Sequence, residues 1–183
     1  RDKGYHQQFS RNVLQWNRGG GRFSEVSRLA GVEATDWSWG ALLFDIDGDG
    51  NKDIFVANGI GKDLIDQDYV KFDGNGDVIR QTLIEEGKSI LTLFDKAPSE
   101  KLVNGVFRNE GQLQFQIAND AWGMNQISFS NGAAYGDLDN DGDLDLVVTN
   151  LDQPAFVYRN NSTDNHLLIE LKQGNSANLN GTG

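Results

Sequence analysis

The chain repeats itself at a spacing of 92 residues. When residues 12–59 are laid on residues 104–151 without a gap, fifteen of the 48 aligned positions are identical. A shorter match, VFRNE at 106–110 with VYRNN at 157–161, has an offset of 51 residues. The two offsets differ by 41, so the repeated unit is near 51 residues and its first copy carries an insertion of that difference. A fixed period of this size is typical of repeat architectures such as propellers and solenoids.

Each unit contains four short apolar segments that we expect to be strands. Residues such as Val, Ile, Phe and Leu alternate there with clusters of Asn, Asp and Gly, which is typical of strands joined by turns. The expected strands are GALLF and GAAYG, DIFVAN and DLVVTN, GVFRN and FVYRN, and RFSEV and QFQIA. Such units predict an all-β fold, a partial β-propeller of four-stranded blades. The chain would hold the second half of one blade, one full blade and most of another, about two to two and a half blades.

The insertion, at about residues 61–101, has helical rather than strand spacing. Apolar residues recur there at helical intervals before Pro98: Ile65, Tyr69, Phe72, Ile79, Leu83, Ile90 and Phe94. We expect two short helices, which either pack over one edge of the β structure or bind a partner. The blades are expected to span residues 1–164.

Two acidic loops have the form Asp-x-Asp-x-Asp-Gly-x-x-Asp. We call residues 45–53 loop 1 and residues 137–145 loop 2, and we number the positions of each from 1 to 9. The aspartates at positions 1, 3, 5 and 9 are Asp45, Asp47, Asp49 and Asp53 in loop 1, and Asp137, Asp139, Asp141 and Asp145 in loop 2. Alternate carboxylates in a tight loop converge on one point, and the glycine at position 6 permits the turn. Position 7, Asn51 or Asp143, would offer its backbone carbonyl.

This set of ligands predicts two calcium sites. Oxygen ligands without His or Cys select a hard cation, and calcium accepts six to eight oxygens flexibly. The loops are not EF-hands, because position 12 is Val56 or Val148 where an EF-hand needs a bidentate Glu. The alternative is that Asp-Gly and Asn-Gly are only hairpin turns. Two copies in register with the repeat favour metal binding, with a structural role for the ion.

Charge and composition limit the classes of partner. The formal net charge is −11, and loops 1 and 2 together carry −8 of it. An acidic chain is a poor partner for nucleic acid or anionic lipid. No apolar run approaches the length of about 18 residues that a membrane span needs. There is no cysteine, so thiolate metal sites and disulfides are excluded.

The two loops and their flanking strands resemble a known family. GALLFDIDGDGNKDIFVANG and NGAAYGDLDNDGDLDLVVTN are similar to the FG-GAP/VCBS repeats of integrin-α-like propellers, whose blades carry calcium in this hairpin. Residues 10–172 resemble bacterial proteins related to cartilage acidic protein, in which an ASPIC/UnbV domain follows the propeller. Residues 165–183 resemble the start of that domain, although NLNGTG lacks its usual basic residue. The resemblance implies a calcium-stabilised binding scaffold that is secreted or on the bacterial cell surface, without catalytic residues.

The residues themselves also favour a binding module over an enzyme. The chain has two histidines, no cysteine and no Gly-x-Ser-x-Gly motif. Trp39, Trp37 and Asp36 form the candidate ligand site. Trp39 is its strongest member, because its repeat position is the polar Asn131, so the tryptophan is not a shared packing residue of the blades. Packing between blades would also explain Trp37. We expect a protein or glycan ligand, and the remaining blades from a larger chain or another subunit. The alternative is the propeller scaffold of a larger polysaccharide-handling enzyme.

Overall fold

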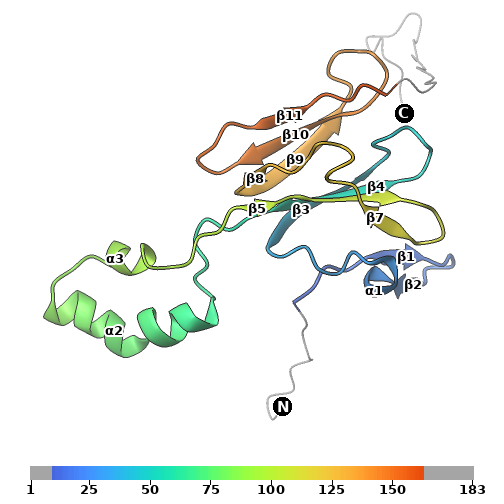
Figure 1. The fold of residues 1–183 in the computed structure, drawn as a ribbon. Coiled ribbons are helices and arrows are strands. Elements are labelled where there is room, and N and C mark those ends of the chain that lie inside the picture. Colours follow the sequence, from blue (N-terminus) through green and yellow to red (C-terminus); the bar gives the residue numbers. More distant parts are fainter. Residues whose placement is uncertain (1–9, 163–183) are drawn as a thin grey trace, which may run out of the picture.

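The computed structural model describes residues 10–162, in which the strands form four antiparallel sheets (Figure 1). The largest sheet has the strand order β3–β4–β6–β7. Its strands are β3 (Ser38–Phe44), β4 (Asp53–Asn58), β6 (Gly105–Asn109) and β7 (Phe115–Ile117). A second sheet has the order β9–β10–β11. Its strands are β9 (Ser130–Gly136), β10 (Asp145–Asn150) and β11 (Phe156–Tyr158).

Two pairs of short strands complete the β structure. One pair is β1 (Gln15–Asn17) with β2 (Phe23–Glu25), and the other is β5 (Leu102–Val103) with β8 (Ile127–Ser128). The 92-residue offset lays the β1–β2 pair on β6 and β7. The described residues therefore contain the outer half of one blade, one four-stranded blade and three strands of another. The predicted all-β fold with propeller blades is confirmed.

Strand β4 is the centre of the packing because it is buried on both faces. Its alternating residues face two apolar clusters, as the two-residue period of a strand requires. Ile54 and Val56 pack with Phe107 and with the segment around α1 (Ser27–Ala30). Phe55 and Ala57 face the other way, into the contact with the three-stranded sheet. A strand buried on both faces explains why DIFVAN has no polar residue in its interior.

The two larger sheets pack against each other through apolar side chains. Phe55, Val106 and Val148 are fully buried in this contact, and each such side chain stabilises the fold by about 1.5–3 kcal/mol. The rings of Phe44 and Tyr135 stack with centroids 4.4 Å apart and an angle of 8° between their planes. Because β3 and β9 are equivalent strands of the repeat, this stack joins the same strand of neighbouring blades, at positions that differ by one residue: the repeat position of Phe44 is Gly136.

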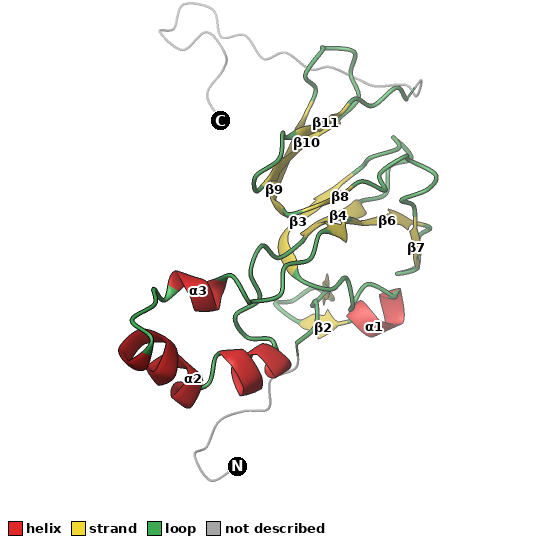
Figure 2. Ribbon diagram, turned by 60° about the vertical axis from the view of Figure 1, so that its left-hand side comes forward, coloured by secondary structure: helices red, strands yellow, loops and turns green. Residues whose placement is uncertain are grey.

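The insertion forms four short helical segments instead of the two predicted helices. They are the π-helical segments η1 (Tyr69–Asp73) and η2 (Gln81–Glu85) and the α-helices α2 (Gly76–Arg80) and α3 (Leu91–Phe94). They extend away from the sheets in both views and cover no sheet edge (Figures 1 and 2). Apolar side chains that could have covered an edge, such as Ile84 and Leu91, are exposed. No helix within residues 10–162 is long and apolar enough to cross a membrane.

Candidate metal centres

Loops 1 and 2 each close a β-hairpin at the same point of a blade. Loop 1 joins β3 to β4 and loop 2 joins β9 to β10, and the hairpins end in the equivalent pairs Phe44 with Asp53 and Gly136 with Asp145. The backbone is left-handed at positions 4 and 6, with φ of 76° and 90° in loop 1 and 61° and 97° in loop 2. Asn140 holds position 4 of loop 2, where its short polar side chain tolerates this conformation. The two loops follow the same backbone path.

The carboxylates at positions 1, 3 and 5 of loop 1 converge. One oxygen each from Asp45, Asp47 and Asp49 lies within 4.8 Å of the others. The backbone N–H of Gly50 donates to Asp45 Oδ2 at 2.9 Å, and that of Asn51 donates to Asp49 Oδ1 at 2.8 Å. Asp45 Oδ1 is buried and accepts no hydrogen bond from residues 10–162. Burying an unpaired carboxylate oxygen costs free energy, so this atom fits the role of a cation ligand.

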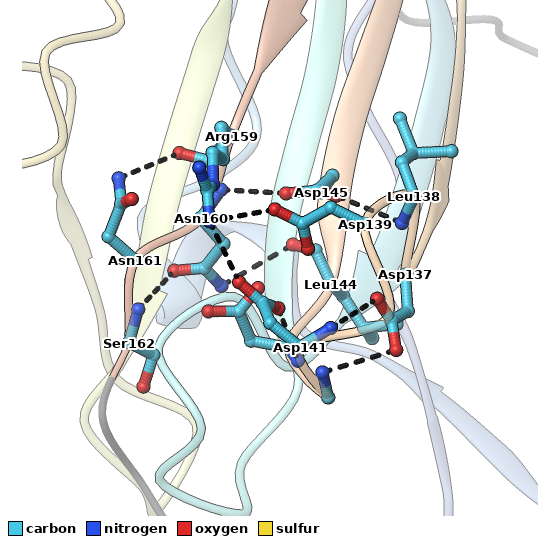
Figure 3. Close-up of polar contacts among 12 residues, drawn as sticks. Asp137, Leu138, Asp139, Asp141, Leu144, Asp145, Arg159, Asn160, Asn161 and Ser162 are labelled. Carbon is cyan, nitrogen blue, oxygen red and sulfur yellow. Dashed lines mark hydrogen bonds and ion pairs between the residues drawn. The ribbon is translucent and has the colours of Figure 1, made fainter.

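The carboxylates of loop 2 repeat this arrangement (Figure 3). Asp137, Asp139 and Asp141 again offer one oxygen each within 4.8 Å of the others. The backbone N–H of Gly142 donates to Asp137 Oδ2 at 3.2 Å, as its counterpart does in loop 1. All three side chains are exposed, whereas only position 5 is exposed in loop 1. The second cluster is more open to solvent, and it differs in one contact: the backbone N–H of Asp141 donates to Asp137 Oδ1 at 3.2 Å, whereas that of Asp49 donates to Asp47 Oδ1 at 3.4 Å.

Position 7 is held close to position 5 in both loops. The backbone N–H of Asp143 donates to Asp141 Oδ1 at 3.3 Å, which matches the bond from Asn51 in loop 1. Burial and the carboxylate of Asp141 raise the pKa of Asp143. The N–H of Asp143, with a smaller contribution from Arg159, lowers the pKa of Asp141. A cation between the loop carboxylates would favour the charged form of both aspartates.

The backbone carbonyl at position 7 was predicted to be a metal ligand, and this role stays a prediction.

The aspartate at position 9 bonds each loop to the chain at the end of the third strand of its blade. Asp53 Oδ2 accepts from the backbone N–H of Ile46 at 2.8 Å, and Oδ1 accepts from that of Asn109 at 2.9 Å. Asp145 accepts equivalent bonds from position 2 of loop 2 and from Asn160. Burial raises the pKa of Asp53, and these hydrogen bonds oppose the shift. Each carboxylate oxygen keeps a second lone pair, so this role is compatible with the predicted one as a metal ligand.

An arginine at the end of the third strand of each blade contacts the carboxylate cluster: Arg108 lies in β6, and Arg159 directly follows β11. Arg108 Nε lies 2.7 Å from Asp47 Oδ2, and its Nη2 lies 3.6 Å from Asp49 Oδ2. In loop 2, Arg159 Nη2 lies 2.8 Å and 3.4 Å from the Oδ2 atoms at positions 3 and 5 (Figure 3). The aspartate motif gave no indication of these residues. The available signal was the Arg-Asn pair that VFRNE and VYRNN share.

The asparagine after each arginine binds the loop backbone. Asn109 Nδ2 donates to the carbonyl of Lys52, at position 8 of loop 1, at 2.9 Å. Asn160 Nδ2 donates to the carbonyl of Leu144, at position 8 of loop 2, at 3.4 Å. It also donates to the carbonyl of Ile46 in loop 1, at 2.7 Å. One side chain therefore contacts both candidate metal loops.

The predicted ligand-binding tryptophans lie at the start of β3, the end opposite to loop 1. Trp37 and Trp39 line a pocket of about 600 Å³ together with Phe129, and their ring centroids are 6.1 Å apart. Trp39 Nε1 donates to the carbonyl of Gly59 at 2.6 Å. Asp36 is not among the residues that line the pocket, and its Oδ1 accepts from the backbone N–H of Trp37 at 2.8 Å. The structure brings the two tryptophans together and turns Asp36 to the local backbone.

The sequence around loop 1 can be compared with known families. Residues 5–56 match the FG-GAP-like repeat family. The match includes all of loop 1 and ends in β4, and loop 2 repeats the same spacing 92 residues later. FG-GAP repeats form propeller blades, in agreement with the four-stranded sheet. A comparison with curated proteins found no match. Two acidic clusters that could hold metal ions thus occupy equivalent hairpins of repeated blades.

Proposed function

We propose that the chain is a non-enzymatic, calcium-binding β-propeller module in which one ion closes each of loops 1 and 2. The observation that carries this proposal is the buried, unpartnered Oδ1 of Asp45 in a triad that loop 2 repeats. The carboxylates at positions 1, 3, 5 and 9 and the carbonyl at position 7 would hold the ion. An ion at this point would replace carboxylate repulsion by attraction, and so keep the two strands of the hairpin together.

Calcium suits these loops better than the other common divalent cations. All proposed ligands are oxygens, which disfavours zinc and copper. Five protein ligands from one loop match the six to eight oxygens and variable geometry of calcium once water is added. Magnesium requires a near-octahedral arrangement and retains several waters. FG-GAP repeats often bind calcium, which supports the same choice.

Calorimetric titration of the metal-free chain with CaCl2 tests this proposal. We expect two bound ions per chain, and stabilisation by about 2.7 kcal/mol per site at a free calcium concentration of 100 times Kd. A calcium chelator should return the melting temperature to its metal-free value, and MgCl2 at the same concentration should give a smaller increase. Absence of binding heat, together with a melting temperature that chelation leaves unchanged, would contradict calcium binding.

The wider role that we propose is adhesion, glycan binding or protein assembly in a secreted or cell-surface protein. FG-GAP repeats occur in extracellular proteins, which supports this setting. The narrower relationship to bacterial proteins with an ASPIC/UnbV domain stays a prediction, and residues 165–183, on which part of it depends, lie outside the described residues.

The tryptophan pocket favours a glycan among these ligands. The indole N–H of Trp39 is already bonded to the backbone, yet the side chain is 57% exposed. An exposed ring face can stack on a sugar ring, and polar groups at the edge can bind hydroxyls. Lys62, Ser99 and Asp152 provide such groups in the lining of the pocket.

Binding to a panel of immobilised glycans tests the role of this pocket. The Trp39→Ala variant should lose binding, because it removes the exposed ring. Trp16→Ala is the matched control, since Trp16 is also exposed but lies in β1, outside this pocket. The glycan proposal fails if the wild type binds no member of the panel, or if both variants bind as the wild type does.

A further inference from the structure

We propose that Arg108 and Arg159 are built-in counter-ions of loops 1 and 2. Each arginine stabilises its carboxylate triad when no metal is bound, and each lowers the affinity of its loop for a divalent cation. This inference rests on the proposed calcium binding, and it adds a residue pair that sets how tightly the ions are held.

The first support is that two distant parts of the chain build the same contact. Both arginines approach positions 3 and 5 of their loops, and the shortest distances are 2.7 Å and 2.8 Å. Arg159 follows Asp139 by 20 residues, whereas Arg108 follows Asp47 by 61 because the insertion lies between them. The contact is therefore kept by the pairing of the strands and not by closeness in sequence. A chance surface ion pair would not be expected to survive such an insertion in one copy.

The second support is the choice of carboxylates. In each loop the arginine pairs with Oδ2 at positions 3 and 5, and no ion pair joins it to position 1. The unpartnered Oδ1 of Asp45 is thus left available to a cation. One guanidinium reduces the formal charge of each triad from three negative charges to two. It lessens the repulsion between the carboxylates without filling the position of the ion.

The third support is that both arginines can withdraw. Their side chains are 44% and 64% exposed. Exposed ion pairs are weak, so an ion with five or more oxygen ligands should prevail over them. A guanidinium that stays nearby then repels the bound cation, and one that leaves loses its ion pairs. In either case the arginine reduces the apparent affinity for the metal.

The test compares the R108Q/R159Q double variant with the wild type. Calorimetric titration with CaCl2 at low ionic strength should show binding about three- to tenfold tighter in the variant, because a nearby positive charge has been removed. The metal-free melting temperature should fall at the same time, because the triads lose their counter-ions. Raising the salt concentration to 1 M should reduce both differences, since it screens exposed charges.

Two further variants separate charge from geometry. R80Q removes one positive charge from an exposed residue in α2, and it should change neither the affinity nor the melting temperature. R108K/R159K keeps the charges without the planar guanidinium, and its affinity should stay within about twofold of the wild type.

Weaker calcium binding in R108Q/R159Q would overturn the inference, because the arginines would then be positioning residues that orient the metal ligands. Unchanged affinity with an unchanged metal-free melting temperature would overturn it as well. If the wild type binds no calcium, the proposed function fails together with the effect on affinity. The counter-ion role is then tested by the metal-free melting temperatures: it is supported if R108Q/R159Q melts below the wild type while R80Q does not, and overturned if neither variant changes.

Discussion

The side-chain amide of Asn160 donates a 2.7 Å hydrogen bond to the backbone carbonyl of Ile46, 114 residues earlier in the chain. Ile46 is at position 2 of loop 1, and Asn160 lies beside loop 2, where its own N–H binds Asp145. The bond therefore connects the two candidate metal loops across the contact between neighbouring blades.

Replacing Asn160 should weaken the packing of one blade on the next. Asn160→Ala leaves the carbonyl of Ile46 without this donor, and Ile46 is buried, so we expect a loss of about 1–3 kcal/mol in the free energy of unfolding. Asn161→Ala is the control, because that side chain is exposed and makes one long bond to a neighbouring carbonyl. Urea denaturation measures both variants. Equal losses in the two would show that the bond to Ile46 contributes nothing.

Position 6 should require glycine because of its left-handed backbone conformation, and not because a side chain would lack space there. Gly50 has φ of 90°, and within residues 10–162 no atom outside its two chain neighbours lies within 4 Å of where a Cβ would be. Gly50→Ala should therefore cost about 1–2 kcal/mol through backbone strain alone. Gly40→Ala is the control, because Gly40 has equal space and an ordinary φ. The prediction is wrong if Gly50→Ala and Gly40→Ala have the same melting temperature in thermal denaturation.

Removing position 1 of one loop should abolish one calcium site. Asp45→Asn and Asp137→Asn should each reduce the number of bound ions measured by calorimetry from two to one, because the carboxylate at the head of the triad is lost. Asp77→Asn is the control, because it removes a carboxylate from α2, outside both loops, and it should leave two ions bound. Two bound ions in all three variants would show that the ions lie elsewhere.

Acid should release the contact that Glu25 makes at the start of α1. Hydrogen bonds from Ser27, with a smaller contribution from Arg11, lower the pKa of Glu25 to about 2 from its usual 4.5. The folded pKa is depressed, so this stabilisation is complete above about pH 4.5 and is lost as the pH falls toward 2. Between pH 5 and 2.5 the melting temperature of Glu25→Gln should fall less than that of the wild type. Glu33→Gln should follow the wild type, and parallel curves for all three would refute the linkage.

The repeat explains why the strands could be predicted well from the sequence. The segments DIFVAN, DLVVTN and GVFRN coincide with β4, β10 and β6. Each has apolar, largely β-branched or aromatic residues at buried positions, and each ends at turn residues. A second copy of each segment removes the ambiguity that a short apolar run has on its own. The aspartates could be grouped for the same reason, because the spacing of loop ligands is local.

Contacts between distant segments could not be predicted in this way. The pairing of Arg108 with Asp47 depends on which strand lies beside which, and a local motif does not contain that information. The same is true of Asp53, whose carboxylate accepts a bond from the N–H of Asn109 after the whole insertion. The insertion has no second copy for comparison. Its apolar spacing predicts helices, but it does not predict where the helices end or that they extend away from the sheets.

The ends of the insertion meet in a bridge between Ile60 and Glu100, whose backbone N–H groups and carbonyls bond to each other at 3.3 Å and 3.1 Å. The intervening residues therefore act as one very long hairpin connection between β4 and β6. The entropy of closing such a connection grows only slowly with its length. The helical segments can thus change in size or sequence with little effect on the folding of β4 and β6.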